Sequence, residues 1–186
     1  MQNRNNLPAI QVMSPERKTY RWRGNNLTPA ANCSDLLILS GAAGYTIRLT
    51  EVQIQCSSNS AVLVPVLLLR RAALNTGGTI IALNSSVDIA MNGDSAPAAT
   101  LNQYTANPTG LGSGVTNIHG GNLYSPSTIA PNVNEFRIWD FNPIAAAPPA
   151  IVNNPNMLFA INLGGGSLPG GLNTFGISIE WTEDLS

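Results

Sequence analysis

The chain has 186 residues, of which 44% are hydrophobic and 10% are charged, and its formal net charge is −1. This length suits one domain that buries about 70% of its unfolded surface, a core that needs no disulfide or metal. The charge gives no general attraction to nucleic acid, and the longest apolar run (61–69) is too short for a membrane-spanning helix. The first residues lack the apolar stretch of a signal peptide, so we expect synthesis in the cytoplasm without export. The low charge favours a subunit that hides part of its surface in an assembly.

The first 24 residues are basic. Their five cationic side chains, opposed by one acidic residue, give a net charge of +4 and leave −5 for the remainder: Arg4, Arg17, Lys18, Arg21 and Arg23. We predict an extended N-terminal arm over 1–24, with these five residues binding an acidic partner or a neighbouring subunit, and a single β-sandwich domain over 25–186. The alternative for 18–23 is an edge strand with Tyr20 and Trp22 on its buried face, whose charges prevent sheets from associating.

Strand signals follow in chain order, and no segment shows convincing helical periodicity. A short apolar run at 35–39 is followed by an alternating segment at 45–56. The apolar residues of 45–56 face one way only if the period slips once near Thr50, which predicts a β-bulge. The run 61–70 is almost entirely apolar, which predicts a strand covered on both faces, and Pro65 within it predicts an edge or bulge position.

The turn-rich middle of the chain is followed by clear alternation near the C-terminus. Five further strands are predicted at 98–104, 115–124, 134–141, 156–163 and 174–183. Eight to ten short strands over one domain length predict an all-β fold, an antiparallel β-sandwich. The long connections 84–98 and 144–155 are typical of crossings between the two sheets, so we expect a jelly-roll-like arrangement.

Residues that carry chemistry are few. His119 is the only histidine, in a glycine-rich segment that we interpret as a turn, and no second histidine or cysteine motif completes a triad or a metal site. Cys33 and Cys56 have no zinc or redox spacing and are expected to be buried and reduced. Around Asp88 and Asp94 the alternating ligands of a calcium loop are missing. We therefore expect no enzyme activity, no metal and no cofactor.

Three ordered segments carry a resemblance: 47–54 with 66–71 and 75–79, then 104–112, then 175–183. In their order and spacing they resemble a family of small structural proteins of tailed bacteriophages and prophages. The likeness covers about residues 45–183. It implies a β-sandwich component of the virion and carries over no catalytic residue.

Within that family, a capsid decoration (cement) protein is the leading interpretation. Such a subunit would be a homotrimer that binds the major capsid protein on the outer surface of the phage head, without contact to nucleic acid or membrane. The alternative is a tail or head-fibre adhesin that binds a host surface glycan through Asn-rich loops with scattered Trp and Tyr, a binding that deletion of the loop at 107–114 should remove.

Overall fold

The computed structural model describes residues 17–89, 94–126, 136–141 and 150–186. Across these ranges the chain is built from strands, with one 3-10 turn, η1 (Asn84–Ser86). The strands are β1 (Lys18–Leu27), β2 (Asp35–Ser40), β3 (Tyr45–Ser58), β4 (Val62–Arg71), β5 (Thr79–Ala82), β6 (Asp88–Ile89), β7 (Thr100–Ala106), β8 (Thr116–Ser125), β9 (Phe136–Asp140), β10 (Ala150–Val152), β11 (Leu158–Asn162) and β12 (Leu172–Leu185). No helix in the described ranges has the length and apolar character that crossing a membrane requires.

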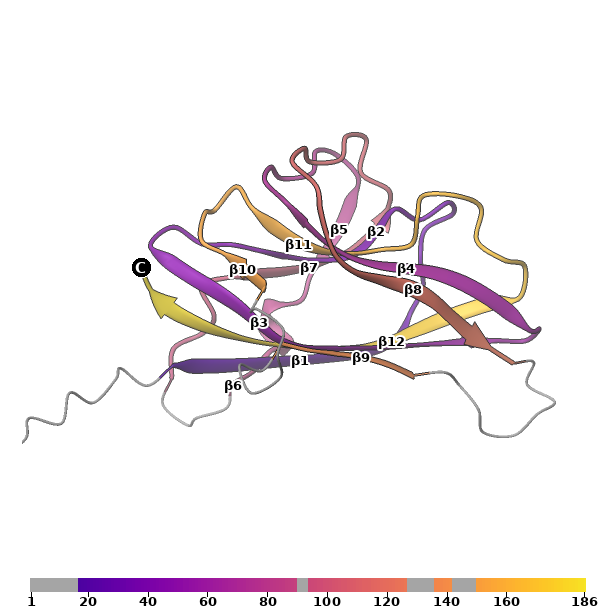
Figure 1. The fold of residues 1–186 in the computed structure, drawn as a ribbon, viewed down its shortest axis with the longest axis horizontal. Coiled ribbons are helices and arrows are strands. Elements are labelled where there is room, and N and C mark those ends of the chain that lie inside the picture. The colour runs from indigo at the N-terminus through magenta and orange to yellow at the C-terminus, as the bar shows by residue number, and fades with distance from the viewer. Residues whose placement is uncertain (1–16, 90–93, 127–135, 142–149) are drawn as a thin grey trace, which may run out of the picture.

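Two antiparallel sheets stack face to face, which confirms the predicted all-β sandwich (Figure 1). The first sheet has the order β10-β3-β12-β1-β6, with β9 also paired to β3, and the second has the order β5-β7-β2-β11-β4-β8. Eight strands pair as β1-β12-β3-β9 and β2-β11-β4-β8, which is the strand arrangement of a jelly roll. The remaining strands, β5, β6, β7 and β10, extend the edges of this frame.

The core lies between the sheets and follows from the alternation along each strand. In β12 the inward positions are large and fully or almost fully buried: Phe175, Ile177, Ile179 and Trp181. The Trp181 ring stacks on Tyr20 of β1, with centroids 5.7 Å apart. Each such side chain contributes about 1.5–3 kcal/mol by leaving water, so this alternating pattern holds β12 with one face toward the core.

The bulge predicted in the long strand β3 is confirmed. Glu51 pairs with Glu180 while Leu49 pairs with the next residue, Trp181, so Thr50 is the extra residue. Because of this step, Leu49 and Val52 both point inward and are fully buried. The bulge therefore keeps both halves of a 14-residue strand facing the same core.

Strand β4 corrects one prediction. It is covered on both faces only near its C-terminal end, whereas Leu63 is 55% exposed and Pro65 is also exposed. The outer face is covered only near Leu69, which packs in a second cluster with Ile38, Tyr104, Leu158 and Ala160. Strand β11 pairs with Leu67 to Arg71 and does not extend to Leu63 and Pro65. Pro65 lies beyond β11 and pairs only with β8, where a residue without an N–H is tolerated.

The predicted boundary of the N-terminal arm is also corrected. Residues 18–24 form part of β1, which pairs with β12 from Lys18 to Leu27. Tyr20 is fully buried and Trp22 is 4% exposed, so this segment belongs to the core. The alternative of a strand with its aromatic residues facing inward holds instead, because two buried aromatic rings outweigh the charges beside them. Residues 1–16, including Arg4, lie outside the described residues.

A buried polar network fixes two loops onto the outer face of the second sheet. The Arg71 guanidinium donates two hydrogen bonds of 3.0 Å to the Asp35 carboxylate and one of 3.1 Å to the Gly112 carbonyl. Asn75 and Asn162 donate to the same carboxylate at 2.7 and 2.6 Å. This network joins the loop between β4 and β5, through Asn75, and the loop between β7 and β8, through Gly112, to strands β2, β4 and β11.

Candidate binding groove

The structure describes four of the five predicted partner-binding residues, and three of them contact other parts of the sandwich. Arg17 pairs with Asp184 at 3.3 Å, and Arg21 pairs with Glu180. The Lys18 ammonium donates to the Ser95 hydroxyl at 2.9 Å. Such partly exposed contacts are worth little individually. They nevertheless show that these cations follow the surface of the domain and do not form a separate arm.

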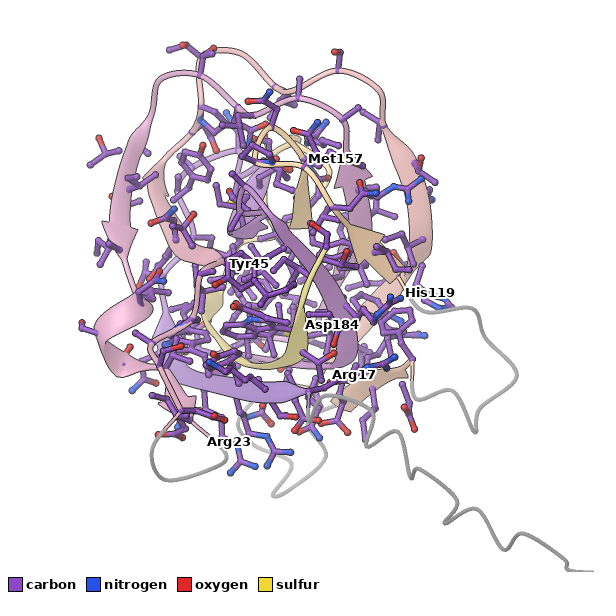
Figure 2. The ribbon with its side chains drawn as sticks, turned by 90° about the vertical axis from the view of Figure 1, so that its left-hand side faces the viewer. Arg17, Arg23, Tyr45, His119, Met157 and Asp184 are labelled. Atoms are coloured by element: carbon purple, nitrogen blue, oxygen red, sulfur yellow. The ribbon has the colours of Figure 1, made fainter. Side chains whose placement is uncertain are left out.

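Arg23 differs from these three residues. It is exposed and forms no ion pair with any residue in the described ranges. Figure 2 shows Arg23 turned away from the body of the molecule, whereas Arg17 lies beside Asp184. It is therefore the one predicted contact residue in the described ranges whose cationic group neither pairs with a carboxylate nor hydrogen-bonds to another part of the domain.

A second bulge, in β1, shapes the surface beyond Arg23. Gly24 pairs with Ile177 and Leu27 with Phe175, so β1 contains one residue more than β12 over this step. The extra residue leaves Asn25 and Asn26 both exposed, where regular alternation would turn one inward. Asn26 has φ +62°, a left-handed conformation that asparagine tolerates better than most residues.

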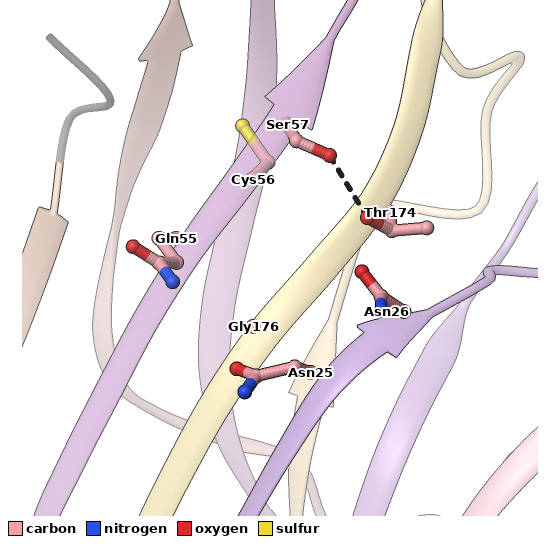
Figure 3. A pocket seen from close by; sticks show the side chains of 7 residues that line it. All are labelled: Asn25, Asn26, Gln55, Cys56, Ser57, Thr174 and Gly176. Carbon is pink, nitrogen blue, oxygen red and sulfur yellow. Dashed lines mark hydrogen bonds between the residues drawn. The ribbon is translucent and has the colours of Figure 1, made fainter. Parts of the chain in front are cut away.

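Gly176 of β12 forms the floor between β1 and β3 (Figure 3). A Cβ atom at this position would lie 2.8 Å from Gln55 Nε2 and 3.3 Å from Asn25 Oδ1. The absence of a side chain thus opens a groove whose walls are the side chains of β1 and β3. Close to Gly176, the hydroxyls of Ser57 and Thr174 hydrogen-bond to each other across 2.8 Å.

The groove consists of two adjoining hollows of about 290 and 260 Å³, near the lower end of the range for ligand pockets. Polar side chains and glycine line them, with only Cys56 and Ile177 as apolar members. The lining residues are Arg23, Asn25, Asn26, Gln53, Gln55, Cys56, Ser57, Thr174, Gly176, Ile177 and Ser178. Arg23 is the only ionised side chain among them.

Side chains of both charge signs lie on the same face of the sheet beyond Arg23. A third hollow, of about 290 Å³, is lined there by Arg21, Glu180 and Asp88 together with Arg23 and Thr19. Arg21 and Glu180 form an ion pair there, and Glu51 accepts a hydrogen bond of 2.7 Å from the lining residue Gln53, so the amide-lined part of the groove has Arg23 as its own cation with acids just beyond it. Its amides and hydroxyls can donate and accept hydrogen bonds, and its lining contains no histidine or carboxylate that could act as a base. This arrangement is suited to binding.

The residues considered for chemistry lie elsewhere. His119 is in strand β8 and not in a turn. Its ring stacks on Trp139 of β9, with centroids 6.1 Å apart, and lies tilted against Phe141, just after β9, with centroids 5.4 Å apart. Cys33 and Cys56 are buried and free, as predicted. Among the described residues, no group of three or more metal-ligating side chains comes together.

The loop at 107–114, suggested above as a glycan site, is occupied by internal contacts. The Asn107 amide accepts from the Ser34 N–H at 3.1 Å and donates to the Ala31 and Asn32 carbonyls at 2.8 and 3.0 Å. Gly112 takes part in the buried network of Arg71. The polar groups of this loop are thus used in contacts within the domain. The groove on the first sheet is the stronger candidate for a glycan site.

In comparisons with known proteins, no family model, curated protein or solved structure matches the chain. The groove is therefore assigned as a candidate site from its geometry alone. Sequence reasoning missed Asn25, Gln55 and Gly176, because they meet only through the pairing of β1, β12 and β3. The alternation of each strand could have indicated which polar residues face outward. It could not have indicated which strands lie next to each other in the sheet.

Proposed function

We propose that the chain is a non-enzymatic structural subunit of a bacteriophage virion, a decoration protein on the outer surface of the head. The observation that carries the proposal is an uncharged end of the sandwich with exposed apolar side chains. Residues 72–87 and 95–134 contain no Lys, Arg, Asp or Glu. They supply β5 and β7 at one edge of the second sheet, where the uncharged end lies, and β8 at its opposite edge.

Six large hydrophobic side chains in these segments are 42–52% exposed: Leu74, Ile80, Ile81, Leu111, Val115 and, on β8, Tyr124. Strand β5 is exposed along its whole length and forms the edge of the sheet, next to β7 (Figure 1). Soluble proteins usually protect such an edge with charges. An unprotected edge with exposed isoleucines suits burial against another protein.

The proposed partners of this edge are the major capsid protein and further copies of this chain, arranged as a homotrimer. A subunit that binds only the assembled shell stabilises it by mass action, and many such contacts would resist internal pressure. The jelly roll supports the proposal in a general way, since capsid proteins use it, but lectins and cupins use it too.

The first test is the copy number of the protein in purified virions. A decoration protein should be present in hundreds of copies, and particles that lack it should break at lower temperature or on chelation. Six or twelve copies per particle would contradict the proposal and indicate a tail component.

The second test changes the exposed edge. Replacing both Ile80 and Ile81 by Lys should abolish association with the virion, because two ammonium groups would have to leave water. The melting temperature should change little, since both side chains are about half exposed. Ile138→Lys is the matched control, an isoleucine that is 52% exposed on β9 of the other sheet. If the Ile80→Lys/Ile81→Lys variant binds virions like the control, the edge is not the contact surface.

A further inference from the structure

We propose that the groove over Gly176 binds an acidic oligosaccharide, with its amides on the sugar hydroxyls and Arg23 on a carboxylate. This inference does not depend on a location in the virion.

The hydrogen-bonding groups of the groove are available. The side chains of Asn25, Gln55 and Ser178 line it and form no hydrogen bond with any residue in the described ranges. Each amide offers donors and an acceptor at the same time, as a sugar hydroxyl does. The bulge in β1 adds Asn26 beside Asn25, so amides face each other across the floor. A chain of hydroxyl groups laid along β12 would meet partners from both walls.

The shape of the groove favours a sugar over a peptide. Extended peptides are commonly bound along a sheet edge, where they add a strand, but this groove crosses the middle of a sheet with strands on both sides. Peptide side chains also need apolar pockets, and the apolar lining residues Cys56 and Ile177 are buried in the core. The lining contains no aromatic ring, so affinity should come from hydrogen bonds and be modest.

The charge of the ligand follows from Arg23. A guanidinium matches a carboxylate with two parallel hydrogen bonds, which are stronger than bonds between neutral groups. The acids nearest the groove on this face gather at the Arg23 end: Glu180 and Asp88 line the hollow beyond Arg23, where Glu180 is paired with Arg21, and Glu51 accepts a hydrogen bond of 2.7 Å from the Gln53 amide. None of the three lines the groove itself, whose one ionised lining side chain is Arg23. The groove should therefore distinguish a sugar acid from its neutral counterpart.

The test is a titration of isotopically labelled full chain, followed by NMR, with tetragalacturonate and with maltotetraose as the neutral probe. We expect saturable shifts of the side-chain amide signals of Asn25, Gln53 and Gln55, and at least tenfold tighter binding of the acidic probe. Arg23→Gln should remove this preference while leaving weak binding of both probes. A glycan array with other uronic-acid and sialic-acid oligosaccharides extends the search beyond one sugar.

Gly176→Ala tests the groove itself. The added methyl should weaken binding of the acidic probe at least tenfold, because it crowds Gln55 and Asn25. Folding should persist, since the position lies on the outer face and its φ is not in the left-handed region. Gly170→Ala is the matched control, with nothing within 4 Å of the added methyl. Unchanged binding by Gly176→Ala, shifts confined to another surface, shifts produced only by an uncharged peptide, or no saturable binding to any acidic glycan on the array would each overturn the proposal. The copy number in virions is unaffected by any of these results.

Discussion

Buried charge in the described residues is confined to Asp35, Arg71 and Glu183, and each has several hydrogen-bond partners. Glu183 accepts from the backbone N–H groups of Ala98 and Ala99 at 2.8 and 3.0 Å. Its carboxylate also accepts from Trp181 Nε1 at 3.0 Å. These residues hold loops against the sheets, so their role at the residue scale is structural.

Removing one member of the buried pair should be costly. Asp35→Ala leaves the Arg71 guanidinium buried without its anion, and we expect the free energy of unfolding to fall by about 3–5 kcal/mol. Asp184→Ala, which breaks only partly exposed pairs with Arg17 and Arg48, should lower it by no more than about 1 kcal/mol. Urea unfolding of both variants measures the difference, and equal losses would mean that the buried network does not hold the loops.

Stability should fall at alkaline pH because of Cys33. Burial raises the pKa of its thiol from 9.0 to about 11. The unfolded chain therefore loses this proton at lower pH than the folded protein, so the contribution is complete below pH 9 and is lost as pH rises toward 11. The loss should reach about 2 kcal/mol at pH 11. In thermal melts between pH 8 and 11, Cys33→Ala should show a smaller decline than the unchanged protein, whereas parallel curves would contradict this assignment.

At the scale of elements, β1 combines a core face and a ligand face in one strand. Its inward side supplies Tyr20 and Trp22 to the core, and its outward side supplies Arg23, Asn25 and Asn26 to the groove. The two bulges, in β3 and β1, each preserve the inward face while changing what the outward face displays.

Two neighbouring positions separate these faces experimentally. Trp22→Ala should lower the free energy of unfolding by about 3–5 kcal/mol, because a buried indole is lost together with its hydrogen bond to Ser86. Arg23→Ala, one residue further on the exposed face, should stay within about 0.5 kcal/mol of the unchanged protein. Chemical denaturation gives both values. A stable Trp22→Ala variant would restore the idea of a detachable arm.

The strands that could be predicted from the sequence are those that bury an alternating face, such as β3 and β12. Strands β5, β6 and β10 were missed because they have two to four residues and, for β5 and β6, no buried position. Their pairing depends on neighbours placed by the rest of the fold. The groove and the Asp35–Arg71 pair were inaccessible for the same reason, since each joins side chains from strands far apart in the chain.

At the scale of the whole molecule, the jelly roll gives the two sheets different exposed sides. The first sheet presents the polar groove and most of the charged pairs, while the second presents the uncharged end around β5. The groove and the apolar edge belong to different sheets, so a ligand in the groove and a protein at the edge would occupy separate surfaces.

The pairing of β1 with β12 also orders events during protein synthesis. Strand β12 lies between β1 and β3 in the first sheet, yet it is translated after every other strand described. Until β12 leaves the ribosome, β1 and β3 have unpaired edges in the nascent chain, and the core lacks the buried side chains of β12. A chain that stops before residue 172 would keep these edges unpaired, so interrupted products should be recognised by chaperones and proteases as unfolded.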